Sequence, residues 1–282
     1  MSSAEARAML SHCEPPRRTV PNPLADALAE AFRGPLRGYA SSLIVEMGLG
    51  RRFSYIVTEE GLLGIAYVPQ DEPIPSWLLD SEARLGGLAA YAWSHPLLTS
   101  LALAAANAAT AGVLDQDPGL VEMGGDLFAA LDSLEGSRIA LIGYVPGVAA
   151  ALAERAESLT IYEDNPMHRR EAEKQGHTVL PGDQLLVDAG QAGYTVMVAT
   201  GASLLDPRVL IAAEKAKPRI LALVGPTSSF HPAVARRLGV HVLGGSYIPP
   251  QNRATLLRLV KAGYGFRAVK KLVVKWVWSS RG

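Results

Sequence analysis

The stretch RIALIGYVPGVAAALAERAESLTIYEDNP, residues 138–166, decides the fold. An apolar run over residues 139–142 ends at Gly143, and a Pro-Gly pair marks the turn after it. Apolar residues then recur at helical spacing, with charged residues on the opposite face. A second apolar run, residues 159–162, follows. Because two strands joined through a helix pair in parallel, the stretch predicts a buried parallel sheet with its ligand site at the carboxyl ends of the strands.

The turn after the first strand leaves two interpretations open. A dinucleotide fingerprint is G-x-G-x-x-G, whereas residues 143–147 read GYVPG, and Pro146 has no amide hydrogen to offer a phosphate. Glu163 follows Gly143 by 20 residues, where dinucleotide-binding folds place an acid on a ribose hydroxyl. The unit is therefore either a nucleotide site or a packed turn followed by a solvated acidic loop.

Strands and helices continue to alternate along the rest of the chain. Strands are predicted at residues 178–180, 195–200, 220–224 and 240–243, and helices at residues 168–175, 206–215, 231–238 and 251–262. This alternation is typical of a doubly wound, mostly parallel α/β sheet. Glycine and polar side chains gather where its strands end, and a ligand can approach the backbone there. The ligand-binding residues predicted at this edge are Gly143, Glu163, Asn165, Thr200, Gly201, Gly225 and Thr227.

The run of strands followed by helices predicts a smaller α+β domain at residues 22–124, preceded by a flexible arm at residues 1–21. Asn22-Pro23 begins a helix, since asparagine caps a helix and proline suits its first turn. Three strands are predicted at residues 38–47, 52–58 and 62–68, and two Ala- and Leu-rich helices at residues 82–110, with a break at residues 94–96. Asn107 interrupts an alanine run in the second helix. Because asparagine is a poor helix former, Asn107 either faces solvent or points its amide into a ligand cleft.

Composition sets limits on the class of protein. The 282 residues are 49% hydrophobic and 19% charged, which predicts a large core. Cys13 is the single cysteine, so neither an internal disulfide nor a thiolate cluster for a metal can form. The N-terminus has no apolar signal core, and we expect no transmembrane segment and a cytoplasmic protein. The chain also lacks the G-x-S-x-G, H-E-x-x-H and G-x-x-x-x-G-K motifs.

Charge is strongly segregated along a chain whose net charge is zero. All 27 acidic residues lie within residues 1–214, whereas residues 215–282 hold 13 Lys and Arg and no acid. Such a basic segment could meet an anionic ligand, a membrane surface or nucleic acid, or pair with the acidic part of the same molecule or of a twin subunit. Residues 266–282 read as an amphipathic helix or an edge strand, or else as a disordered basic tail. Trp276 and Trp278 should pack on the body or on a second subunit, which favours a homodimer.

Several motifs together resemble a known family over about residues 23–250. They are Asn107-Ala108, Glu163-Asp164-Asn165-Pro166, Thr200-Gly201 and Gly225-Pro226. Their combination resembles the family described as "Putative heavy-metal chelation". The resemblance implies a domain like the amino-terminal domain of enolase at residues 22–124, a Rossmann-like domain at residues 125–265, and a proposed active site in the cleft between them. Residues 266–282 lie outside this resemblance.

We therefore expect the interdomain cleft to bind a metal ion or a metal-bearing or anionic small molecule. A divalent metal would need oxygen or imidazole ligands, and the candidates are Glu163, Asp164, His95 and His231. They lie on separate loops, so we expect a weak metal site or one completed by a bound small molecule. Two alternatives remain: an enzyme acting on a nucleotide or anionic metabolite in the same cleft, and an interaction protein that uses its basic C-terminus.

Overall fold

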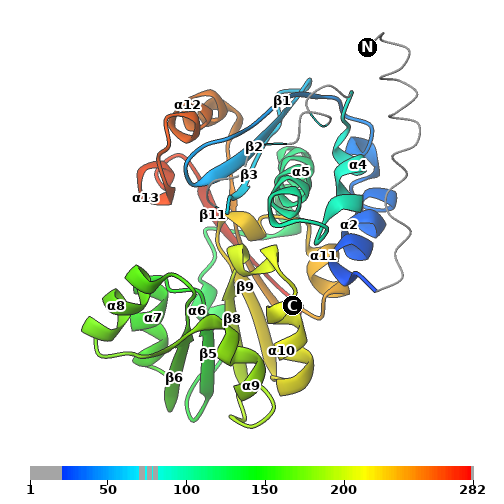
Figure 1. Cartoon of the computed structure of the whole chain (residues 1–282). Helices are drawn as coiled ribbons and strands as arrows, with labels where there is room; N and C mark the ends of the chain where they lie inside the picture. The colour runs from blue at the N-terminus through cyan, green and yellow to red at the C-terminus, as the bar shows by residue number, and fades with distance from the viewer. Residues whose placement is uncertain (1–20, 70–73, 75–77, 79–81, 281–282) are drawn as a thin grey trace, which may run out of the picture.

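Two sheets organise the chain, as Figure 1 shows. The computed structural model describes residues 21–69, 74, 78 and 82–280, so the expected arm lies outside the described residues apart from Pro21. A small sheet has the order β1-β2-β3, and a large sheet has the order β4-β11-β10-β9-β8-β5-β6-β7. The protein is therefore a mixed α/β structure whose large sheet is mostly parallel, as the sequence predicts.

The small sheet is antiparallel and follows helix α2 (Pro23–Arg33). The side chain of Asn22 caps this helix by accepting from the amide of Ala25 at 3.0 Å. The strands are β1 (Ile44–Leu49), β2 (Phe53–Thr58) and β3 (Leu63–Tyr67). The first strand begins later than predicted, because residues 37–39 form a 3₁₀ turn and pairing with β2 starts only at Ile44.

Helix α5 (Pro96–Gln116) packs against this sheet after the short helix α4 (Leu85–Leu88). Gly64 permits the close approach, since a Cβ there would lie 1.9 Å from the carbonyl oxygen of Ala104. By length and composition alone, α5 could cross a membrane. However, 89% of its most apolar 18-residue window is buried inside the structure, so it is accounted for as a core helix.

The large sheet contains six parallel strands in a doubly wound order. They are β5 (Arg138–Ile142), β6 (Ser158–Tyr162), β7 (Thr178–Leu180), β8 (Val196–Thr200), β9 (Ile220–Val224) and β10 (Val242–Tyr247). Counted from β5, their spatial order is 3-2-1-4-5-6, the order found in dinucleotide-binding sheets. From β5 the chain first adds β6 and β7 on one side and then β8, β9 and β10 on the other. A crevice is expected at this switch point, between β5 and β8.

Helices cover both faces of the large sheet. One face carries α6 (Leu127–Ala130), α7 (Pro146–Ala153) and α8 (Pro166–Lys174). The other face carries α9 (Leu185–Asp188), α10 (Arg208–Ala216) and α11 (Pro232–Arg237). The apolar cluster on this second face continues into α2 and α5, so the two sheets are joined through one core. A cleft between them is therefore held by shared packing rather than by a flexible linker.

The C-terminal segment corrects three expectations. Helices α12 (Pro250–Lys261) and α13 (Phe266–Val269) leave the large sheet and pack on the small one, where Leu256 and Val260 join the core of β2 and β3. Strand β11 (Val274–Ser279) then returns to the large sheet and pairs antiparallel with β10 and with β4 (Glu122–Met123). The strand alternative is therefore correct except for its position, which is interior and not at the edge, and the amphipathic helix and the disordered tail are wrong for these residues. Trp276 and Trp278 are buried in the chain's own core, so they give no ground for a dimer.

Candidate functional site

A cavity of about 460 Å³ lies at the carboxyl ends of β5, β6 and β8. Residues from both parts of the chain line it, because Tyr67, Pro69 and Pro96 close it from the side of the small sheet. Five of the predicted site residues are brought together in its wall: Gly143, Glu163, Asp164, Asn165 and Thr200. The predicted location, the strand-end edge beside the first part of the chain, is therefore where the structure has a cavity.

Glu163 ties the ends of β5 and β6 together. Its carboxylate accepts from the amide of Tyr144 at 2.7 Å and from the amide of Asn165 at 2.8 Å. The side chain of Glu163 is only 11% exposed, and His168 Nδ1 lies 3.5 Å from the same carboxylate. Gly143 makes this turn with a φ of +85°, and a Cβ there would lie 2.5 Å from Thr200 Oγ1. The carboxylate thus fixes the turn while it lines the cavity.

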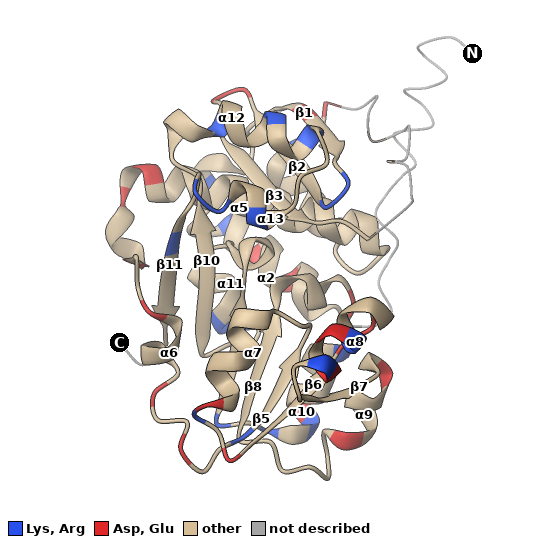
Figure 2. Cartoon of the chain, turned by 90° about the vertical axis from the view of Figure 1, so that its left-hand side faces the viewer, with Lys and Arg blue, Asp and Glu red and all other residues tan. Residues whose placement is uncertain are grey.

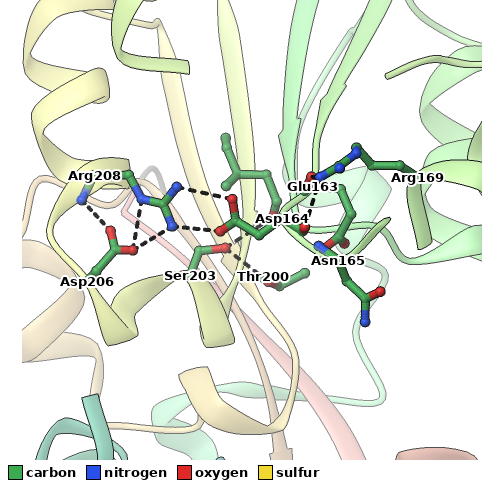
Figure 3. Close-up of polar contacts among 9 residues, drawn as sticks. Glu163, Asp164, Asn165, Arg169, Thr200, Ser203, Asp206 and Arg208 are labelled. Carbon is green, nitrogen blue, oxygen red and sulfur yellow. Dashed lines mark hydrogen bonds and ion pairs between the residues drawn. The ribbon is translucent and has the colours of Figure 1, made fainter. Parts of the chain in front are cut away.

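Asp164 belongs to an ion-pair cluster with Arg208 and Asp206 (Figure 3), and all three residues line the cavity. Arg208 donates to both carboxylate oxygens of Asp164, at 3.2 and 2.6 Å, and Nε of Arg208 donates to Asp206 at 2.8 Å. The hydrogen bonds from Arg208 hold the pKa of Asp164 below its usual range. Because Nε, Nη1 and Nη2 of the guanidinium are all engaged by these carboxylates, Arg208 has little capacity left for an anionic ligand.

Three hydroxyl groups, those of Thr200, Ser203 and Tyr162, complete the cavity wall. Thr200 Oγ1 and Ser203 Oγ lie 3.1 Å apart, in hydrogen-bond contact. The hydroxyl of Tyr162, which also lines the cavity, donates to Asp188 at 2.7 Å and shares a hydrogen bond with Tyr194. Burial and these two partners raise the pKa of Tyr162, so its hydroxyl stays protonated.

Sequence reasoning missed Arg208 and Asp206 as members of the site. The Asp206-Pro207 pair signalled only the start of a helix, and Arg208 reaches Asp164 across 44 residues of sequence. The available signal was the position of Arg208, a basic residue in the first turn of a helix that follows a strand end. This position does not identify the carboxylate with which Arg208 pairs.

The remaining predicted ligand-binding residues lie at the seam between the two sheets, outside the wall of the 460 Å³ cavity. Asn107 is buried, and its Nδ2 donates to the carbonyl oxygens of Ile65, Pro226 and Thr227 at 2.8, 3.2 and 3.2 Å. It therefore reaches the turn after β9 and not the Thr200-Gly201 turn. Gly225 and Thr227 are in the turn after β9, where Thr227 accepts from the amide of Tyr67. Gly201 follows β8 and packs against Thr227.

The four metal-ligand candidates do not converge. Among the described residues no group of three or more His, Cys, Asp or Glu side chains could hold a metal ion. His95 and His231 each cap the start of a helix, where Nδ1 accepts from a backbone amide. Burial lowers the pKa of His231 to about 4. Glu163 and Asp164 remain at the cavity, so a complete metal site is not formed by the described side chains alone.

Comparison with known proteins places this fold. It is similar to the crystal structure of a DUF364-family protein of unknown function from Pyrococcus horikoshii, with a TM-score of 0.71, 18% identity, and 91% of this chain and 99% of that chain covered. A second DUF364-family structure of unknown function, from Desulfitobacterium hafniense DCB-2, gives a TM-score of 0.70 at 19% identity, with 90% and 99% covered. No relative was found among curated proteins.

The sequence model of one family matches residues 126–279, a segment that includes β11 and so extends beyond the resemblance expected from the sequence. That family is described as "Putative heavy-metal chelation". The match covers more than half of the chain, and it contains every residue that the large sheet contributes to the cavity wall. The chain therefore belongs to the DUF364 family.

Proposed function

We propose that the 460 Å³ cavity binds a metal ion carried by a small organic chelator. The observation that carries this proposal is a cavity of ligand size with carboxylates in its wall but no assembled set of metal ligands. Small-molecule sites commonly enclose about 300–1,000 Å³. A metal that arrives with its own donors needs only a few from the protein, and Glu163, Asp164, Thr200 and Ser203 offer oxygen atoms at this wall.

The charge of the wall favours a cation. Three carboxylates, those of Glu163, Asp164 and Asp206, line the cavity together with one guanidinium, that of Arg208. Because the carboxylates outnumber the guanidinium, the local potential is negative. The paired state of Arg208 removes the one group that would otherwise attract an anion.

Two features count against a nucleotide in the same cavity. In dinucleotide-binding folds the first turn offers its backbone amides to a phosphate. Here the carboxylate of Glu163 already accepts the amide of Tyr144, and Pro146 has no amide hydrogen. A phosphate at this turn would meet a carboxylate oxygen that already lies 2.7 Å from the amide nitrogen it needs. The metal-bearing ligand is therefore the better fit.

Titration calorimetry on chelator-treated protein tests the proposal. We expect Ni²⁺ and Zn²⁺ alone to bind weakly, and their one-to-one complexes with histidine or glycine, which keep a net positive charge, to bind more tightly. Asp164→Asn should weaken binding of the complex about tenfold, equivalent to about 1.4 kcal/mol. Glu154→Gln, an exposed carboxylate on the far end of α7, is the matched control and should change nothing. Submicromolar stoichiometric binding of bare metal, or binding of a nucleotide and of no metal complex, would refute the proposal.

A further inference from the structure

Some basic side chains of the C-terminal segment form ion pairs with carboxylates, whereas a group around α13 does not. Arg253 pairs with Asp115 at 2.6 Å, and Lys261 pairs with Glu46, so these two cations are held by acids from the first part of the chain. Around α13 the position differs. No carboxylate of a described residue forms an ion pair with any member of a group that we call the basic patch, namely Arg51, Arg52, Arg267, Lys270 and Lys271.

Contacts in the fold bring the basic patch together from two distant segments. Arg51 and Arg52 lie in the connection between β1 and β2 and abut the turn between α12 and α13. A Cβ on Gly263 would lie 3.3 Å from Arg51 Cβ, and one on Gly265 would lie 3.5 Å from Arg52 Cγ. Figure 2 shows the basic residues at α13 and at the nearby loop on one side of the molecule.

The other three cations lie in α13 and directly after it. Arg267 is in α13, Lys270 is the αR residue that ends the helix, and Lys271 follows in the next turn. All three are exposed, whereas Val269 between them is buried against the small sheet. The patch is thus the outward face of an element whose inward face is held by the core.

Tyr264 adds an aromatic ring to the basic patch. It lies in the turn between α12 and α13, flanked by the two glycines that abut Arg51 and Arg52, and it is 53% exposed. A ring that exposed in a turn has a face available for stacking. Phe266 and Val269, the larger apolar groups of α13, pack inward instead.

We propose that the basic patch and Tyr264 bind single-stranded nucleic acid, independently of the cavity. Phosphates pair with the five cations, and an unpaired base stacks on the tyrosine ring, which is the combination that sequence-tolerant single-strand binders use. A membrane is the poorer fit, because interfacial binding requires large apolar side chains on the outward face, and those of α13 face the small sheet.

Fluorescence anisotropy of a labelled 20-nucleotide oligo(dT), titrated with the full chain at several salt concentrations, tests this proposal. Five phosphate contacts predict a slope of log K against log salt of about −3.5, at about 0.7 per contact. Replacing Arg267, Lys270 and Lys271 by glutamine should reduce the slope to about −1.4 and weaken binding roughly a hundredfold near 0.1 M salt. Tyr264→Ala should weaken binding about tenfold, and Tyr264→Phe should not.

Controls separate this partner from other polyanions. Glutamine at Arg33, Arg37 and Lys174 removes the same charge from exposed positions elsewhere and should leave binding unchanged. Circular dichroism and thermal melting establish that each variant is folded. Binding to vesicles containing anionic lipid but not to oligo(dT), binding that the triple variant retains, or equal affinity of the tyrosine, phenylalanine and alanine proteins would each overturn the proposal.

Discussion

Asn107→Ala should destabilise the protein by about 2–3 kcal/mol, because this amide fastens the small sheet to the large one. Its two Nδ2 hydrogens serve three carbonyl oxygens, one in β3 and two in the turn after β9. Two net hydrogen bonds contribute about 1 kcal/mol each, and the carbonyls left without a donor add to the loss. Removing Oδ1, which is buried without a partner, returns part of that loss. Guanidinium denaturation measures the change, and a fall in Tm of about 5–8 °C should accompany it.

Thr110→Ala is the matched control on the same helix. Thr110 is equally buried, but its hydroxyl donates only to Ala106, four residues earlier in α5. Its replacement should cost within about 1 kcal/mol, because no contact between the sheets is lost. Asn107 does not line the cavity, so Asn107→Ala should keep the affinity for a metal complex at temperatures where it is folded. A loss no larger than that of the control would refute the role of Asn107 as a fastener.

Three further predictions follow from other features. Because burial lowers the pKa of His231 to about 4, the unfolded chain takes up the proton first as the pH falls. The free energy of unfolding should therefore fall by about 3 kcal/mol between pH 6.5 and pH 4, and denaturation curves of His231→Asn should lack this contribution. Gly143→Ala should weaken binding of a metal complex in calorimetry, since a Cβ meets Thr200 Oγ1 and the φ of +85° disfavours alanine; unchanged affinity would count against it. Truncation after residue 265 should prevent folding, seen as lost near-ultraviolet dichroism, because β11 is an interior strand.

Local patterns predicted those parts of the fold that depend on neighbours in sequence. The unit of β5, α7 and β6 appears where its apolar runs lie, and proline at position 96 begins α5 as expected. Glu163 reached the cavity because the end of a parallel strand fixes its location. These features share one property, that a period or a turn residue encodes them within a short window.

Features that depend on distant partners were not predictable. Residues 272–277 fit a helix, an edge strand or a tail about equally, and only pairing with β10 and β4 selects an interior strand. Arg208 becomes part of the site through Asp164, which lies on a different loop. His95 and His231 were candidates for metal ligands, but their positions at helix starts favour a capping role, and capping of α5 and α11 does occupy their Nδ1 atoms.

The excursion of α12 and α13 from the large sheet to the small one has a consequence for biosynthesis. The ribosome makes the chain from its N-terminus, so β2 and β3 emerge about 190 residues before the helix that covers Phe53, Tyr55, Leu63 and Ile65. During that interval an apolar sheet face has no cover of its own, and such surfaces promote aggregation and recruit chaperones. β11 emerges after all the other described strands, yet it lies inside the large sheet. Neither sheet can therefore complete its native packing until residue 279 has left the ribosome.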